Sequence, residues 1–322
     1  MTLLFCLALL FFYARQGEPN LLVVNKEKVV ISNLPKELEG FRIVQISDLH
    51  GKEFAENKLV EKVNGLQPDI LVITGDVLDI YHRDYGYIQR VLGPMKAKFG
   101  KFFVSGNNEY TAELSWNKME QAYRQAKVTV LHNQSYQINS NGRHLWLVGV
   151  DDPNTNHDRL NQALQGTDQA PKILLAHSPE IVNQASAGNI DLVLVGHTHG
   201  GQVRIPGLTQ RPGLKNKVDS ILVKANHLIN RGLNFIWRHR DKLNGINLPN
   251  MELSEADTPK VKLPRAGTVF TYNMKPGFEQ YIAGLYRVGN TQMYVNRGLG
   301  ETRTPFRLFS PPEIVEVKLT RK

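Results

Sequence analysis

Two histidines lie close together in a glycine-rich stretch, GHTHGG, which runs from Gly196 to Gly201. The run before it, DLVLV, is continuously apolar, and this predicts a strand buried on both faces. His197 and His199 then follow a strand end on a turn, where neutral imidazole is a good ligand for divalent transition metals. A histidine pair alone is more often structural than functional, so the metal hypothesis depends on further ligands elsewhere in the chain.

Side chains with suitable chemistry follow other apolar runs upstream. RIVQIS (Arg42–Ser47), DILVITG, KFFVSG (Lys101–Gly106) and KILLA are predicted buried strands, and a carboxylate, amide or imidazole follows each. In chain order, the candidate metal ligands are Asp48, His50, Asp76, Asn107, His177, His197 and His199. A single Asp at such a place is usually a turn or capping residue, but the whole series argues against that interpretation. Carboxylate, imidazole and amide oxygen suit a pair of transition-metal ions rather than a thiolate cluster or an all-oxygen calcium site.

Strands and helices alternate through this region, which predicts an α/β fold with the ligands at the carboxyl ends of the strands. ENKLVEKVNGL has apolar residues at helical spacing, and a further helix is predicted from about Glu113 to Gln125. Hairpins are predicted around Asn141–Gly142 and Gly289–Asn290, and PEIVEVKL is predicted to close the chain as a strand.

The motifs DLH, GDVLD, GNNE, AHSP and GHTHGG, in this order and spacing, resemble the calcineurin-like metallophosphoesterases, in particular a bacterial, membrane-associated branch. The segment AGLYRVGNTQMYVNRGLG is also similar to that branch. The resemblance covers roughly Arg42 to Pro206 and then Gln280 to the end. It implies a four-layer α/β/β/α sandwich, in which two mixed sheets are flanked by helices.

The resemblance also implies a role for each candidate ligand. The first metal would be held by Asp48, His50 and His199, the second by Asn107, His177 and His197, and Asp76 would bridge both, with Asp79 orienting a ligand. The implied cofactors are two divalent ions, with Mn, Fe and Zn all compatible with these ligands. Two such ions about 4 Å apart can clamp a phosphoryl group and lower the pKa of a bridging water, so that hydroxide attacks phosphorus in line.

One position departs from the family pattern. The family usually has GNH followed by an acid, whereas Asn108 follows Asn107 here, and an amide cannot deliver a proton to a leaving group. Loss of a general acid typically costs about 10²- to 10⁴-fold. Three outcomes are open. His157 or His82 could supply the proton, or the leaving group could be acidic enough to need none, as in a pyrophosphate or aryl ester. The third outcome is that catalysis is largely lost. We expect retained hydrolysis, with Asn108 and Asp76 as catalytic residues, because the metal set is intact.

The chain of 322 residues is 41% hydrophobic, has a formal net charge of +9 and contains Cys6 as its single cysteine. A sizeable core and an anionic partner are therefore expected, and an intramolecular disulfide framework is excluded. We predict a metallophosphoesterase domain over residues 28–322, preceded by a hydrophobic anchor or signal-like segment over residues 1–20. The apolar run Leu3–Tyr13 is short for a spanning helix and lacks the features of an ordinary signal peptide, so a docked or disordered tail is the alternative.

An insertion over residues 207–268 interleaves basic and apolar side chains. This mix suits a helix on an anionic membrane surface or a cap over the substrate cleft, and the alternative is a solvated helical hairpin that packs on its own domain. The side chains expected to contact substrate or membrane are Arg204, Arg211, Lys215 and Lys217. Nucleic acid is a less favoured partner, because the apolar N-terminus independently favours a membrane.

The sequence therefore predicts a membrane-associated, dinuclear metal-dependent hydrolase of phosphoester bonds. The expected substrate is a phosphodiester or pyrophosphate in a lipid-linked molecule, and the side of the membrane is left open. The alternatives are a catalytically weak or inactive metal-binding membrane protein, and a nuclease.

Overall fold

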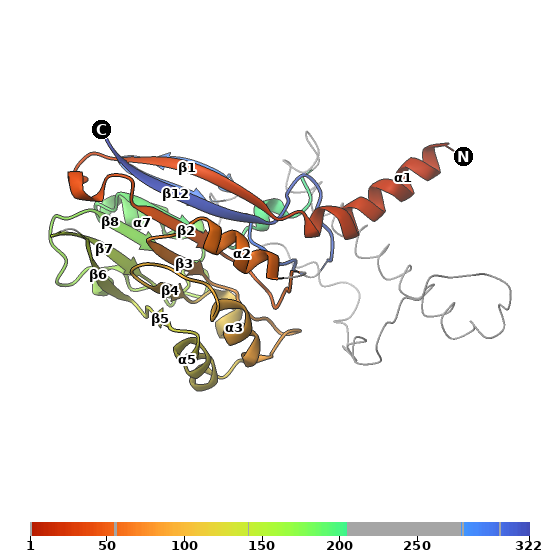
Figure 1. Cartoon of the computed structure of the whole chain (residues 1–322), viewed down its shortest axis with the longest axis horizontal. Coiled ribbons are helices and arrows are strands. Elements are labelled where there is room, and N and C mark those ends of the chain that lie inside the picture. The colour runs from red at the N-terminus through yellow and green to blue at the C-terminus, as the bar shows by residue number, and fades with distance from the viewer. Residues whose placement is uncertain (1, 55–56, 141, 205–277, 279, 303) are drawn as a thin grey trace. The chain divides into compact units, whose positions relative to one another are not determined.

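Two six-stranded sheets form the body of the chain in the computed structural model, which describes residues 2–54, 57–140, 142–204, 278, 280–302 and 304–322 (Figure 1). These residues fall in one compact unit, Met1–Arg204 with Asn273–Lys322. A second unit, Ile205–Tyr272, lies outside the described residues. The predicted insertion over residues 207–268, with Arg211, Lys215 and Lys217, therefore also lies outside them.

The first sheet has the strand order β1-β12-β2-β3-β4-β5. Its strands are β1 (Val23–Ile31), β12 (Glu313–Arg321), β2 (Arg42–Ile46), β3 (Ile70–Thr74), β4 (Lys101–Val104) and β5 (Val128–Val130). The antiparallel pairing of β12 with β2 makes this sheet mixed, whereas β2, β3, β4 and β5 run parallel.

The second sheet has the order β10-β11-β9-β8-β7-β6. Its strands are β10 (Gly284–Val288), β11 (Thr291–Val295), β9 (Leu192–Val195), β8 (Lys172–Leu175), β7 (Arg143–Gly149) and β6 (Gln134–Ser140). Both predicted hairpins are confirmed, since β6 pairs antiparallel with β7 and β10 with β11. The strands β11, β9, β8 and β7 run parallel between the two hairpin edges.

Alternation along the central strands explains why their sequences are apolar throughout. On β3, Ile70 and Val72 belong to the apolar core shared by the two sheets, whereas Leu71 and Ile73 belong to a core that includes helical residues. Successive side chains of a strand point to opposite faces, so a strand covered on both sides needs apolar residues at every position.

Helices cover the outer face of each sheet. The helices α2 (Lys58–Gly65), α3 (Tyr85–Leu92) and α5 (Trp116–Gln125) contribute to the core against the first sheet, and α6 (Leu160–Ala163) and α7 (Val182–Ala187) to the core against the second. This arrangement confirms the predicted α/β/β/α sandwich. The helix expected from about Glu113 begins at Trp116, after Ser115 as N-cap, and a short helix α4 (Asn107–Thr111) precedes it.

Ordered packing begins earlier than the domain start predicted at residue 28. The strand β1 already begins at Val23 and pairs in parallel with β12, and Glu18 and Pro19 are buried. The sequence missed this because β1, VVNKEKVVI, carries charged residues on a partly exposed edge strand and so lacks the fully apolar signature of the central strands.

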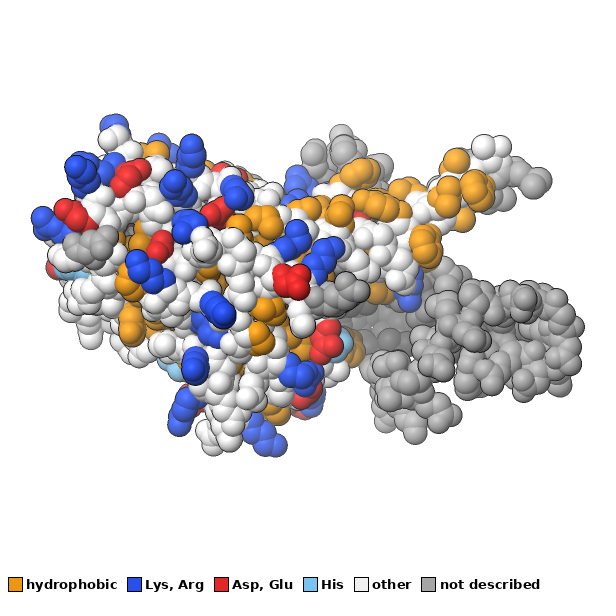
Figure 2. Space-filling view, viewed as in Figure 1, with side chains coloured by type: hydrophobic (Ala, Val, Ile, Leu, Met, Phe, Trp, Pro, Cys, Tyr) orange, Lys and Arg blue, Asp and Glu red, His pale blue; other side chains and the backbone are white. Residues whose placement is uncertain are grey.

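The first helix, α1 (Thr2–Phe12), extends away from the sheets in Figure 1. It has no charged residue, and Phe5, Leu9 and Phe12 are between 53% and 65% exposed. Figure 2 shows hydrophobic side chains along this projecting helix. Among the helices of the described residues, none is long and apolar enough to cross a membrane.

Candidate metal centre

All seven candidate ligands meet where the carboxyl ends of five central strands come together. Asp48 and His50 follow β2, Asp76 follows β3, Asn107 follows β4, His177 follows β8, and His197 and His199 follow β9. A hydrogen bond joins the two sheets here, since the His197 backbone amide donates to Asp48 Oδ2 at 3.0 Å. All of these residues are buried except Asn107, which is half-buried.

The backbone at several of these residues is strained. Positive φ angles occur at Asp48 (50°), His50 (48°), Asp76 (52°), His197 (70°) and His199 (51°). A non-glycine residue in this left-handed region costs on the order of 1 kcal/mol or more, and such residues cluster at functional sites. Here the strain turns short side chains back from the strand ends toward one another.

The first group of converging atoms comes from Asp48, His50 and His199. His50 Nε2 lies 3.1 Å from His199 Nε2, and His199 Nε2 lies 3.3 Å from Asp48 Oδ1. Two ligand atoms about 2.1 Å from one tetrahedral or octahedral ion are about 3.0–3.4 Å apart. The three side chains therefore have the spacing of ligands around a single ion.

The second group comes from Asp76, Asn107, His177 and His197. His177 Nε2 lies 3.2 Å from Asn107 Oδ1 and 3.4 Å from Asp76 Oδ2. His197 Nδ1 lies 2.9 Å from Asn107 Oδ1. Asp76 Oδ2 is also 3.7 Å from His50 Nε2, so this carboxylate lies between the two groups. Asp48, Asp76 and His177 form a third combination whose ligand atoms lie within 4.8 Å of one another.

Hydrogen bonds behind three imidazoles fix which nitrogen faces the cluster. His177 Nδ1 lies 2.8 Å from Thr74 O, and His199 Nδ1 lies 3.0 Å from Gly300 O. A carbonyl oxygen only accepts, so each Nδ1 donates its hydrogen and leaves the Nε2 lone pair pointing inward. His50 Nδ1 lies 3.2 Å from Asp79 Oδ2, which orients His50 in the same way. This donor set fits divalent transition-metal ions.

Electrostatics keeps the carboxylates of the cluster ionised. Burial raises the pKa of Asp48, but the imidazoles of His199 and His177 outweigh it and hold that pKa well below its usual value. Burial likewise opposes ionisation of Asp76, yet His177 and His50 lower its pKa to about 2. Buried carboxylates that remain negative are suitable partners for cations.

The imidazoles divide into two classes. Burial and the neighbouring His177 lower the pKa of His197 to about 3, and burial lowers that of His199. Burial also lowers the pKa of His50 and His177, but nearby carboxylates, Asp76 among them, outweigh it and raise both values above the ordinary one. Protons and metal ions therefore compete for His50 and His177.

Asn108, which occupies the position of the family histidine, contacts Asp76 directly. Its backbone amide donates to Asp76 Oδ1 at 2.8 Å, and its side-chain Nδ2 donates to Asp76 Oδ2 at 2.6 Å. The side chain therefore orients the central carboxylate rather than holding a transferable proton.

Two buried groups that support the cluster were not assigned a role from the sequence. Glu109 accepts hydrogen bonds from the backbone amides of Asp76, Val77 and Gly106, and burial and Asp76 raise its pKa to about 7. Arg307 is 0% exposed and donates to Gly300 O at 2.6 Å, the same oxygen that accepts from His199. An acid beside Asn107 is visible in the GNNE motif, but nothing in the sequence around Arg307 indicates its burial.

Hydrogen bonds also connect Glu18, in the N-terminal segment, to the loop that contacts His199. The buried Glu18 carboxylate accepts from the backbone amides of Phe309 at 3.0 Å and Ser310 at 2.5 Å. Ser310 Oγ in turn donates to His199 O at 3.0 Å. The segment that follows α1 is therefore connected through one short loop to a candidate metal ligand.

Other predicted residues lie outside the cluster. Arg204 is exposed, and its backbone amide donates to Leu308 O at 2.7 Å. His82 Nδ1 lies 3.0 Å from Oδ1 of Asp79, the same carboxylate that contacts His50. His157 instead stacks on Tyr110 of α4.

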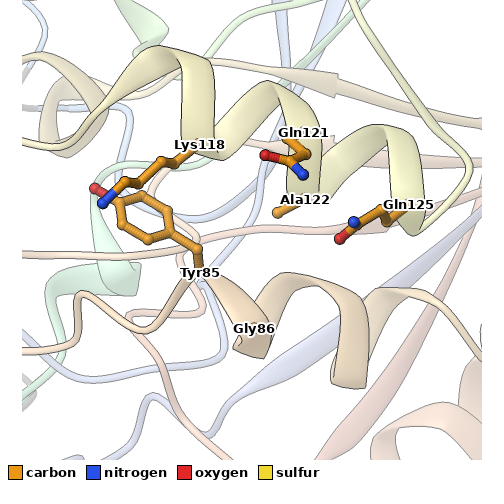
Figure 3. Close-up of a pocket in the computed structure, with 6 residues that line it drawn as sticks. All are labelled: Tyr85, Gly86, Lys118, Gln121, Ala122 and Gln125. Atoms are coloured by element: carbon orange, nitrogen blue, oxygen red, sulfur yellow. The ribbon is translucent and has the colours of Figure 1, made fainter.

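A surface pocket lies between α3 and α5 (Figure 3). Its lining consists of Tyr85, Gly86, Lys118, Gln121, Ala122 and Gln125. None of these is a candidate metal ligand, and the ammonium group of Lys118 lies 5.7 Å from the Tyr85 ring centroid. This pocket is therefore separate from the donor cluster.

The fold and the strand-end donor set define a class of protein. The family model for calcineurin-like phosphoesterases matches residues 41–201, half of the chain, and the chain belongs to this family. It is a metal-dependent hydrolase of phosphoester bonds, as its sequence predicted.

Individual relatives carry related names. The chain is 26% identical over 312 residues to the uncharacterized metallophosphoesterase YkuE of Bacillus subtilis (strain 168), covering 94% of this chain and 87% of that protein. It is 34% identical over 203 residues to an uncharacterized metallophosphoesterase of Aquifex aeolicus (strain VF5), covering 60% of this chain and 75% of the relative. A transmembrane protein with metallophosphoesterase domain from Bos taurus is 34% identical over 202 residues. That match covers 56% of this chain and 45% of the bovine protein, so this chain spans less than half of its length.

Proposed function

We propose that this protein uses two divalent ions to hydrolyse a phosphodiester or pyrophosphate bond in a lipid-linked substrate at a membrane surface. The observation that carries the proposal is the pair of donor groups that share Asp76. His50 Nε2 of the first group and His177 Nε2 of the second lie 3.7 Å and 3.4 Å from its Oδ2. A carboxylate between two imidazole groups suits a bridging ligand.

The first ion would be held by Asp48, His50, His199 and Asp76, and the second by Asp76, Asn107, His177 and His197. When bound, such ions supply Lewis acidity and water of lowered pKa. The chain itself contributes orientation. Asp79, Thr74 O and Gly300 O fix three imidazoles by hydrogen bonds, and Asn108 fixes the central carboxylate. Because the ligands are buried, bulk water is kept away from them, and electrostatic interactions with a phosphoryl group are strengthened.

The exposed apolar helix α1 supports membrane association. Its exposed side chains include Phe5, Leu9, Leu10 and Phe12, and no charged residue interrupts it. Burying such side chains in lipid is favourable by roughly 25 cal/mol per Å² of apolar surface. The exposed apolar side chains of α1 would therefore contact lipid. The exposed Arg204, together with Arg211, Lys215 and Lys217 of the sequence, would contact anionic head groups or the substrate.

The catalytic part of the proposal is tested with purified protein, Mn²⁺ and bis(p-nitrophenyl) phosphate. We expect metal-dependent hydrolysis that is lost in Asp76→Asn, together with binding of about two Mn²⁺ per chain. The matched control is Asp168→Asn, which changes an exposed carboxylate that bonds His144 and Trp146. Wild-type protein that binds metal but hydrolyses none of the aryl, lipid-linked and nucleotide phosphoesters would contradict this part and favour a metal-binding role.

The membrane part is tested by flotation with vesicles of phosphatidylcholine and phosphatidylglycerol. We expect the wild type to float and the Phe5→Asp/Leu9→Asp variant to remain in solution. Leu285→Asp is the control, because Leu285 is also an exposed apolar residue, at 41%, but lies on β10. Flotation of the α1 variant at the wild-type level, or salt-sensitive binding to oligonucleotides in place of vesicles, would contradict the membrane role.

A further inference from the structure

An exposed histidine stacks on α4, the helix that begins with a candidate metal ligand. The imidazole of His157 lies parallel to the ring of Tyr110, with centroids 3.8 Å apart and an interplanar angle of 5°. Tyr110 belongs to α4, the helix that begins with Asn107 and also contains Asn108. His157 is therefore placed over the segment in which the family histidine is replaced.

Contacts at both the ring and the hydroxyl of Tyr110 fix the position of the side chain on which this imidazole stacks. Its ring packs against Trp116, with centroids 5.4 Å apart. Its hydroxyl interacts with Ser105 and Asp151, and burial and Asp151 outweigh the Ser105 contact and raise the pKa of Tyr110 above its usual value. Ser105 lies between the end of β4 and Asn107, so Tyr110 is fixed against the strand end that carries a candidate ligand.

The loop that carries His157 is fixed from the other sheet. The His157 backbone amide donates to Asp152 O at 3.1 Å, and its Nδ1 lies 2.9 Å from Thr155 Oγ1. The Thr155 amide donates to Asp152 Oδ2 at 2.8 Å. Asp152 is fully buried just beyond β7, which pairs with the strand β8 that leads to His177, and the Asp152 charge acts on His177. The loop therefore extends from the strand ends that surround the second donor group.

We propose that His157 donates a proton from Nε2 to the leaving-group oxygen, the step for which Asn108 has no transferable proton. This inference rests on the hydrolysis proposed above. Thr155 Oγ1 engages Nδ1, and among the described residues no hydrogen bond is made by Nε2. Imidazole is the side chain best suited to giving and regaining a proton near neutral pH.

The step balances without a further reactant. A new bond forms between phosphorus and the oxygen of water, and the bond between phosphorus and the leaving oxygen breaks. The electron pair of the broken bond remains on the leaving oxygen, which takes the proton from His157 Nε2 and departs as an alcohol or phosphate. The proton lost by the attacking water returns through solvent to His157.

The other candidate proton donor, His82, contacts a different part of the cluster. His82 Nδ1 contacts Asp79 Oδ1 at 3.0 Å, and Asp79 Oδ2 contacts His50 Nδ1. His82 is thus a neighbour of the first donor group, behind His50. His157 instead lies beside α4, where the half-buried Asn107 and Asn108 form the more accessible edge of the cluster.

The experiment varies the leaving group. In the metal-loaded protein, His157→Gln should lower kcat/KM for methyl p-nitrophenyl phosphate, which expels nitrophenolate, by less than about threefold. For an alkyl diester, whose leaving oxygen needs a proton, the same variant should lose about 10²- to 10⁴-fold. The matched control is His144→Gln. His144 lies on β7, its imidazole contacts the exposed Asp168, and its replacement should leave both rates unchanged.

Several results would overturn the proposal. Equal loss on both substrates would indicate a structural role. Recovery of alkyl-diester hydrolysis in His157→Phe, which keeps an aromatic ring on Tyr110, would indicate stacking alone. A leaving-group effect in His82→Gln instead would assign the proton to His82. If wild-type protein fails on the aryl diester too, the hydrolysis proposal itself falls, whereas intact aryl activity with an unchanged alkyl rate in His157→Gln refutes only the role of His157.

Discussion

His50 and His199 face each other through their Nε2 atoms at 3.1 Å, although neither of these atoms would carry a hydrogen in the arrangement that their outer contacts impose. His199 Nδ1 donates to Gly300 O, and His50 Nδ1 lies beside the Asp79 carboxylate. Two lone pairs pointed at each other repel unless a cation or a proton lies between them. The hydrogen bonds behind the imidazoles therefore make this position suitable for a cation.

The carboxylate of Asp79 should control metal affinity without being a ligand. Asp79→Asn removes the negative charge of the carboxylate that orients His50 through Oδ2. The other oxygen, Oδ1, accepts a hydrogen bond from the His82 backbone amide at 2.8 Å. Loss of such a partner typically weakens metal binding 10- to 100-fold. Competitive titration of Mn²⁺ measures the change, and Asp84→Asn is the control, because Asn caps a helix as well as Asp does at the start of α3. Unchanged Mn²⁺ affinity in Asp79→Asn would contradict the orienting role.

The stabilisation provided by metal should grow with pH. In metal-free protein, burial lowers the pKa of His50 and His177, but carboxylates raise both values above the ordinary one. Protonated imidazoles therefore stabilise the metal-free fold below about pH 6.5, and this contribution is lost as the pH rises through the raised folded-state pKa values.

Metal ions require the neutral imidazoles, so their apparent affinity changes about tenfold per pH unit for each proton displaced. Differential scanning fluorimetry with and without Mn²⁺ should therefore show a larger rise in Tm at about pH 8.5 than at about pH 6, and Asp76→Asn should show little rise at either. If Mn²⁺ raised Tm more at the lower pH, the metal would not be displacing protons from these imidazoles.

The guanidinium of Arg307 should stabilise the loop behind His199. It donates to the carbonyl oxygens of Arg297, Gly298, Gly300 and Ser310. Lysine lacks the planar set of donors, so Arg307→Lys should leave buried carbonyls unsatisfied and cost about 3 kcal/mol, or roughly 6–12 °C in Tm. Thermal unfolding in EDTA separates this effect from metal loss. Arg287→Lys, at an exposed position of β10, should change Tm by less than 1 °C if the effect comes from burial.

Most of the fold was accessible from the sequence because its central strands are buried on both faces. Short apolar runs such as ILVIT in β3 and LVLV in β9 are typical of buried strands. Each is followed within two residues by a candidate metal ligand, Asp76 or His197. The edge strand β1 was not found, since its charged, half-exposed pattern is shared by many surface loops. Strand periodicity therefore predicts the centre of a sheet better than its edges.

The candidate ligands were also accessible, but the groups that orient them were not. Ligand types and spacing are local properties of the sequence, whereas the contact of His199 with Gly300 joins residues 101 positions apart. Glu18 reaches Ser310 across 292 positions through backbone amides, which leave no mark on residue type. Such support depends on how the sheets close on each other, and only the folded chain shows it.

Gly196, the first residue of the GHTHGG motif, should be required because a larger side chain does not fit there. A Cβ on Gly196 would lie 2.0 Å from Ser47 Oγ and 2.3 Å from Asp48 Oδ2, and both neighbours are fully buried. Its φ lies outside the left-handed region, so the expected effect of Gly196→Ala is steric rather than conformational. Displacing Asp48 by even a fraction of an ångström should separate it from His199 and reduce Mn²⁺ affinity by more than about 100-fold.

The matched control for this substitution is Gly65→Ala. Gly65 ends α2, has no atom within 4 Å of the added methyl group and also has no positive φ. Alanine there should raise the stability by up to about 1 kcal/mol, because it reduces the entropy of the unfolded chain and favours the helix. Metal titration and thermal unfolding of both variants distinguish the two cases. Wild-type metal affinity in Gly196→Ala would show that Asp48 does not need its observed position, and the donor geometry assigned to the first ion would then be wrong.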